Sequence, residues 1–237
     1  MSEVSDWDYV AICDPAPPAA RLRWQQILAH TDEHAVNIFD DVSWEFGTTD
    51  DFVIGNREVC ICYYTQAEIE AKVEAIAAGR CRKVGFYYPT GFLAALADAV
   101  PIYDPEGGGA RVCERVRVYP ERLRETILRD ERWLTAYYLD RLTSAIARRD
   151  TYYAFELVGL AVNALVQRLF AAHRTYFRAP KRIDEQLAAL AVRSDRHALA
   201  DALAFVLTQP NDHPSLDAKR LRLAELAELV EDEVCHV

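Results

Sequence analysis

The pattern of apolar residues changes once along this chain, and that change limits the folds open to it. As far as about residue 104, short alternating segments are mixed with helical ones, whereas after Pro120 nearly every segment has helical periodicity. The run Glu106-Gly107-Gly108-Gly109 lies close to the change. The pattern predicts an α+β protein, with a small mixed β-sheet domain over residues 1–110 and a helical bundle over residues 119–237.

Several segments follow the period of strands or helices. Strands are predicted over residues 8–13, 34–39, 52–54 and 59–64, the last two as a hairpin around Gly55. Helices are predicted over residues 19–30, 66–78, 91–99, 120–148, 150–173, 183–192, 195–207 and 215–234. The glycine run 107–109 is predicted to be a turn or linker rather than a phosphate loop, because no Lys-Ser or Lys-Thr follows it and no helix is expected to start on it.

Two aspartates stand at the entrance to the first predicted strand. Asp6 and Asp8 are two residues apart, so in a strand they share one face. Carboxylates held that close repel one another unless a cation lies between them. Mg²⁺ prefers such oxygen ligands and is often held by one or two carboxylates together with substrate phosphates. The pair is therefore either a Mg²⁺ site or two solvated residues near the N-terminus.

Charge and hydropathy exclude some classes of function. The net charge of -10 argues against long nucleic acid as substrate, since affinity for its backbone comes from Lys and Arg. It favours a small or cationic acceptor. No run approaches the ~20 apolar residues that span a bilayer, and the N-terminus has no signal-peptide pattern. We therefore expect a cytoplasmic protein without a membrane segment.

The six cysteines do not form a C-x-x-C pair. Cys60 and Cys62 are expected on one strand face, where free thiols behave as small buried hydrophobic groups. We therefore expect reduced thiols rather than a disulfide or a metal site.

A polar line is predicted along the otherwise apolar helix 151–173. At ~100° per residue, Asn163 and Gln167 project within about 20° of Glu156, and Arg174 continues the line if the helix extends that far. An unpaired carboxylate inside a protein is costly, so the line faces a polar partner or a cleft. Two readings stay open: a hydrogen-bond network inside the bundle, or a stripe that faces an active-site cleft.

The chain resembles the nucleotidyltransferase superfamily of the DNA polymerase beta type, in particular its bacterial branch that includes the aminoglycoside nucleotidyltransferases. The resemblance covers most of the chain in order. Its residues are Ser5-Asp6-Trp7-Asp8-Tyr9-Val10, the stretches 47–55 and 57–64, Pro89-Thr90-Gly91, Ile102-Tyr103-Asp104-Pro105, Arg174-Thr175-Tyr176-Phe177 and Pro180-Lys181-Arg182.

The resemblance implies Mg²⁺-dependent transfer of a nucleoside monophosphate from an NTP, by default ATP, to a hydroxyl of a small-molecule acceptor. It implies Asp6 and Asp8 as metal ligands, with Glu58 as the third carboxylate. It also implies a glutamate from the helical part as the base, for which Glu156 is the candidate. Ser5, Arg174 and Lys181 would contact the nucleotide phosphates.

The sequence departs from the family in two places. The family's Gly-Ser loop would precede Met1 and is not in this sequence, and Cys60 stands where the family usually has Asp or Glu. A thiol is a poor ligand for a hard ion. The alternative is therefore a catalytically inactive, nucleotidyltransferase-like protein with a binding or regulatory role, such as an antitoxin-like one.

Overall fold

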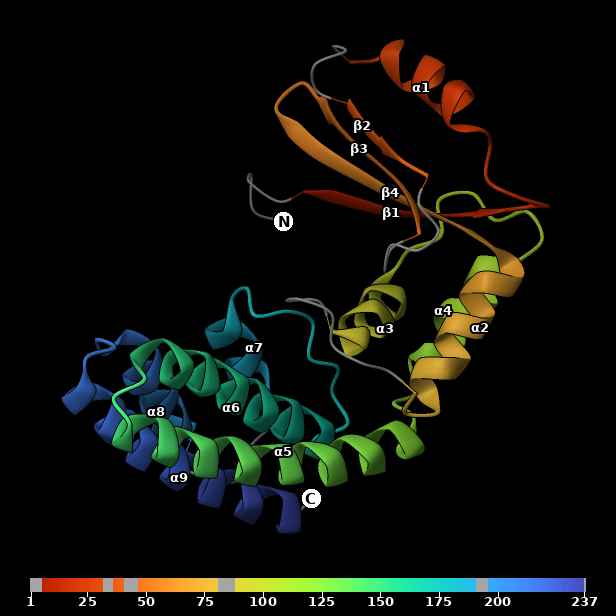
Figure 1. Cartoon of the computed structure of the whole chain (residues 1–237). Helices are drawn as coiled ribbons and strands as arrows, with labels where there is room; N and C mark the ends of the chain where they lie inside the picture. Colours follow the sequence, from red (N-terminus) through yellow and green to blue (C-terminus); the bar gives the residue numbers. More distant parts are fainter. Residues whose placement is uncertain (1–5, 32–35, 41–46, 81–87, 191–195, 237) are drawn as a thin grey trace. The chain divides into compact units, whose positions relative to one another are not determined.

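The computed structural model describes residues 6–31, 36–40, 47–80, 88–190 and 196–236 (Figure 1). Within those ranges the chain is a mixed α+β protein with one four-stranded sheet and nine helices. The strands are β1 (Trp7–Cys13), β2 (Val36–Phe39), β3 (Thr48–Ile54) and β4 (Arg57–Thr65). The helices are α1 (Ala20–Leu28), α2 (Gln66–Ala77), α3 (Pro89–Asp98), α4 (Gly108–Val116), α5 (Glu121–Ala147), α6 (Thr151–Ala172), α7 (Ile183–Ala189), α8 (Arg196–Thr208) and α9 (His213–His236).

The chain separates into two compact units. The first combines residues 1–74 with 100–112 and contains the sheet; the second combines residues 75–99 with 113–237 and is helical. The change of pattern near residues 104–120 thus lies close to one crossing between the units, at 112/113. Residues 75–99, which carry α3, belong to the helical unit rather than to the sheet.

The sheet has the order β1-β4-β3-β2. β1 runs parallel to β4, whereas β3 is antiparallel to both β4 and β2. The predicted hairpin is confirmed, with a two-residue turn at Gly55-Asn56 in place of a three-residue loop. Gly55 has φ +64°, a conformation that glycine adopts at little steric cost.

The two faces of the sheet have different surroundings. Ile27 of α1 packs with Val36, Phe52 and Val59 on one face, and Trp7 and Trp24 lie against this cluster. Because side chains alternate along a strand, the neighbouring positions project from the other face. That second face, which we call the open face, carries Asp8 on β1 and remains exposed at that end.

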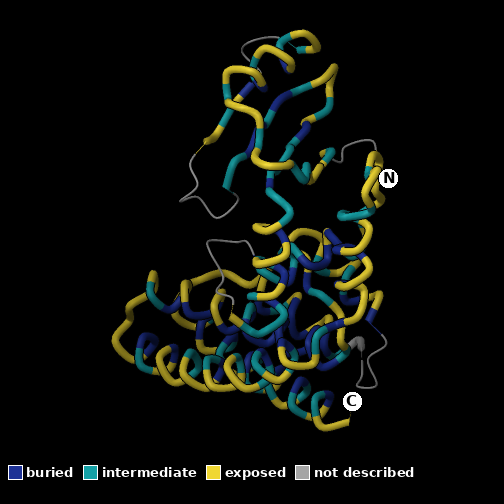
Figure 2. Tube along the Cα trace, turned by 90° about the vertical axis from the view of Figure 1, so that its right-hand side faces the viewer, coloured by how far each residue is buried: buried dark blue, intermediate teal, exposed yellow. Residues whose placement is uncertain are grey.

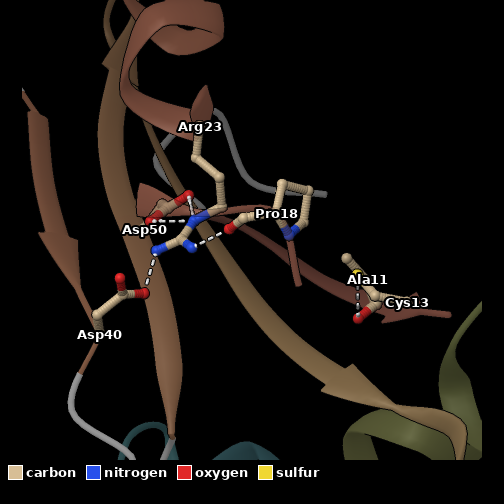
Figure 3. A network of polar contacts seen from close by, with 6 residues as sticks. All are labelled: Ala11, Cys13, Pro18, Arg23, Asp40 and Asp50. Carbon is tan, nitrogen blue, oxygen red and sulfur yellow. Dashed lines mark hydrogen bonds and ion pairs between the residues drawn. The ribbon is translucent and has the colours of Figure 1, made fainter. Parts of the chain in front are cut away.

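A buried ion pair fastens α1 to the sheet (Figure 3). Arg23 Nε donates to both carboxylate oxygens of Asp50 on β3, at 3.2 and 2.9 Å. Its other nitrogens donate to the carbonyl of Pro18 at 2.5 Å and to Asp40 at 2.8 Å. Arg23 is 5% exposed and Asp50 is 0% exposed, so each charge depends on the other for compensation.

Side-chain caps begin α2 and α4. Thr65 and Glu68 form a reciprocal capping box at α2, with Thr65 N–H donating to Glu68 at 2.7 Å and Glu68 N–H donating to the Thr65 hydroxyl at 3.2 Å. α4 was not predicted and begins on the glycine run at Gly108. Asp104 makes this possible, since its carboxylate accepts from the N–H groups of Gly109 at 3.3 Å and Ala110 at 2.7 Å. These bonds lower the pKa of Asp104, and they occupy N–H groups that a phosphate loop would need.

The helical unit is built around α6, and it holds most of the buried residues (Figure 2). α5 and α6 form a helical hairpin through Arg148, Arg149 and Asp150. Arg149 has φ 58°, and the Asp150 carboxylate accepts from Tyr153 N–H.

By length and mean hydropathy α6 could cross a membrane, contrary to the expectation that no stretch approaches that length. However, 72% of its apolar window is buried, as in the core helix of a soluble protein.

Replacing Arg23 with Met should strongly destabilise the protein, because Asp50 would stay buried without its counter-charge. We expect a loss of about 3–5 kcal/mol in the free energy of unfolding, measured by urea denaturation of the full chain. Arg21→Met is the matched control, since Arg21 is exposed on the same helix, and it should change stability by less than about 0.5 kcal/mol. Equal losses in the two variants would show that the pair does not anchor α1.

Candidate functional site

The acidic residues at the start of the chain lie at the edge of the sheet. Asp8 is exposed on β1, and Asp6 is exposed just before the strand begins. The prediction that strand 57–64 lies beside strand 8–13 is confirmed, because β1 and β4 pair in parallel. Ser5, the third member of the predicted group, lies outside the described residues.

A row of polar side chains crosses the open face. Asp8 is in register with Cys60, and Cys60 is in register with Asp51 on β3. Residues in register project from the same face, so two carboxylates flank a thiol across three strands. Glu58 is two residues before Cys60 and therefore shares this face; its side chain is exposed. Asp51 was not predicted as a site residue.

Cys60 and Cys62 are half-buried free thiols that hydrogen-bond to one another. Cys60 also bonds to the Asp51 carboxylate. The bond to Cys62 and burial both raise the pKa of Cys60. For Cys62 the bond from Cys60 lowers the pKa, burial opposes this effect, and the ammonium of Lys72 adds to it. Both thiols are free, as predicted, but they are half-buried rather than buried.

The open face offers oxygen ligands, but the ligands do not converge. Among the described residues, no group of three or more His, Cys, Asp or Glu side chains is placed to hold a metal ion. A hard ion there would need further ligands, such as water or the oxygens of a bound phosphate. The face is suited to an ion that arrives with an anionic ligand rather than to a closed all-protein site.

A shallow cavity of about 220 Å³ in the helical unit gathers arginines. It is lined by Ala94, Ala97, Asp98, Arg117, Arg174, Thr175, Tyr176 and Arg178. Each arginine already has a carboxylate partner: Arg117 bonds Glu114 at 2.5 Å, Arg174 bonds Glu121 at 3.1 Å, and Arg178 bonds Asp98.

These ion pairs allow two interpretations of the cavity. All of them are exposed, and exposed pairs contribute about 0–1 kcal/mol, so an anionic ligand could exchange with the carboxylates. The guanidinium groups also lie where α3, α4 and α6 end, and cations are favoured near the negative ends of helices. The cavity therefore has donors for a phosphate group, and it also has a structural reason to hold arginines.

The remaining residues of this region are less suited to binding. α6 ends at Ala172, so Arg174 lies beyond the helix, at φ 50°. Lys181 is exposed and does not line the cavity. Phe177 is buried against Tyr88 and Phe170. Tyr176 stacks on Tyr119 and donates to the carbonyl of Val116, and burial raises its pKa to about 12; both aromatic side chains are thus structural.

The polar line on α6 divides into two parts. Gln167 is buried, and its amide donates to the hydroxyl of Thr90 on α3 at 3.4 Å, which fits the reading of an internal network. Glu156 is exposed and lies among exposed apolar neighbours on the same helix, namely Phe155 and Leu160. No hydrogen bond or ion pair joins Glu156 to another described residue. Its carboxylate is therefore available to a ligand.

The chain matches no known protein-family model, and no curated protein is significantly similar to it.

The thiol pair gives a pH-dependent prediction. Replacing Cys60 with Ala removes the hydrogen bond that lowers the pKa of Cys62, so the pKa of Cys62 should rise. Alkylation of Cys62 by iodoacetamide, followed by peptide mass spectrometry, should then need a higher pH than in the unsubstituted chain. Cys235→Ser, at an exposed site near the C-terminus, is the control. An unchanged pH profile for Cys62 in the Cys60→Ala variant would contradict the bond.

Proposed function

We propose that this protein is a nucleotidyltransferase that transfers a nucleoside monophosphate from an NTP to a hydroxyl of a small-molecule acceptor. The observation that carries the proposal is the open face of the sheet, where the parallel pairing of β1 with β4 sets Asp8 in one row with Asp51. ATP as the donor and the cytoplasm as the compartment come from the resemblance and the composition. The sheet unit and the helical unit would correspond to the nucleotidyltransferase domain and its helical partner.

The proposed role of the sheet is to hold Mg²⁺. Asp6 and Asp8 would supply carboxylate oxygens, and Glu58 or Asp51 would supply a third from the same face. When bound, Mg²⁺ bridges phosphate oxygens and stabilises the charge that develops on them. Since the ligands do not converge without a nucleotide, metal and NTP should bind together.

Replacing Asp8 with Asn should abolish the binding of Mn²⁺ in the presence of ATP, because the carboxylate that β1 contributes to the row is lost. Isothermal titration of the full chain measures this directly. Glu74→Gln is the control: it removes the same charge from an exposed position on α2 and should bind as the unsubstituted chain does. Binding that persists in Asp8→Asn would overturn the metal site.

The proposed role of the helical unit is to hold the phosphates and activate the acceptor. Arg174 lines the cavity and would contact the triphosphate, and the resemblance adds Lys181 to this role. Glu156 would accept the proton of the attacking hydroxyl as that oxygen bonds to the α-phosphorus and pyrophosphate leaves. Its exposure supports this role, since a general base must reach its substrate.

Replacing Glu156 with Gln should lower nucleotidyl transfer by about 10²–10⁴-fold while leaving the melting temperature almost unchanged. The side chain is exposed, so its loss breaks no buried contact. Pyrophosphate release and thermal unfolding are measured on the same preparation, with the exposed Glu125→Gln on α5 as control. A fall in stability with unchanged turnover would assign Glu156 a structural role.

Two observations favour the alternative, a catalytically inactive binding or regulatory protein. Cys60 occupies the middle of the row, and no group of three ligands converges in the part of the chain that is described. The alternative predicts nucleotide binding without pyrophosphate release for any NTP and divalent metal.

A further inference from the structure

We propose that Cys60 and Cys62 form a two-thiol site for a thiophilic cation on the open face of the sheet. This site is distinct from the proposed nucleotidyl transfer and does not depend on it. Its chemistry is that of soft metals, which thiolate ligands select over Mg²⁺.

The register of the sheet brings the two sulfur atoms together. Cys60 and Cys62 are alternate residues of β4, so both side chains leave the strand on the same face. Cys60 is in register with Asp8 and Asp51, and Cys62 with Val10 and Thr49. The two thiols shift one another's pKa, and both are only half-buried, so an ion from solvent reaches them.

The spacing favours an atom between the sulfurs over a direct bond. Alternate residues of an extended strand have Cα atoms about 6.6–6.8 Å apart, from a rise of about 3.3–3.4 Å per residue. The Cα atoms of a disulfide usually lie about 4.4–6.8 Å apart, most often about 5.5–6 Å, so this pair is at the upper limit. A bridging metal lengthens the connection and leaves β4 extended. Two sulfur ligands are enough for soft ions of low coordination number, so the site does not require a third protein ligand.

The charges around the pair favour a cation. Asp8 and Asp51 both lie near Cys62, and Glu58 shares their face. The opposing charge is Lys72, which reaches this end of the sheet from α2 and hydrogen-bonds to Tyr64 at 3.3 Å. Among the described residues named here, three carboxylates outnumber the ammonium of Lys72, so the surroundings of the pair are negative. A soft cation held there would lie beside Asp8 and Asp51 and would compete with Mg²⁺ for the same carboxylates.

The test titrates Cd²⁺ into the reduced full chain and follows the ultraviolet charge-transfer band of thiolate–cadmium bonds. We expect one site, with at least a tenfold loss of affinity in Cys60→Ser and in Cys62→Ser. Cys13→Ser and Cys235→Ser should bind as the unsubstituted chain does. Equal affinity in Cys62→Ser and the unsubstituted chain, or no charge-transfer band, would overturn the proposal.

Phenylarsine oxide provides a second measurement that responds to the spacing of the thiols. Two thiols replace the arsenic-bound oxygen, two S–As bonds form, and the oxygen leaves as water with both thiol protons. Intact mass should show one phenylarsenic group per chain, and peptide mapping should place it across Cys60 and Cys62. Circular dichroism of the serine variants verifies folding. Mapping to any other cysteine pair, in folded protein, would contradict the site.

Discussion

The buried ion pair between Arg23 and Asp50 determines which face of the sheet is left for function. Asp50 projects from β3 toward α1, and Nε of the guanidinium group donates to both of its oxygens, while Nη1 donates to Pro18 and Nη2 to Asp40. Because the strands alternate, fixing Asp50 on the covered face fixes Asp51 on the open one. A one-residue slip of β3 would bury Asp51 and expose Phe52. The ion pair and the apolar cluster around Ile27 therefore select the same register.

Two kinds of ligand chemistry meet on the open face. Carboxylates at Asp8 and Asp51 suit a hard ion with phosphate, whereas the thiols of Cys60 and Cys62 suit a soft one. A carboxylate in place of Cys60 would join Asp8 and Asp51 in a continuous acidic row, and the thiol interrupts it. Whether the face works in nucleotidyl transfer therefore depends on whether Asp8 can bind a metal ion with help from the nucleotide.

The sequence predicted the strands and most of the helices, because their periodicity is local. α4 was missed because glycine disfavours helix, and the compensating cap comes from Asp104, outside the glycine run.

Among the site residues, Asp51 was missed because its place depends on the pairing of three strands. Periodicity put Glu156 and Gln167 on one line, but it could not show that Gln167 is buried against Thr90 while Glu156 is exposed. Arg117 was also missed, because it lines the same cavity as Arg174 only in the folded chain.

The most direct test of the central claim is to locate a bound Mn²⁺ by its paramagnetic broadening of amide resonances in the presence of a non-hydrolysable ATP analogue. With a metal–nucleotide site on the open face, the amides of Asp8, Cys60 and Asp51 should broaden at the lowest Mn²⁺ concentration, and Asp8→Asn should remove the effect. Uniform weak broadening across the chain, or broadening that survives in Asp8→Asn, would contradict a metal–nucleotide site on the open face of the sheet.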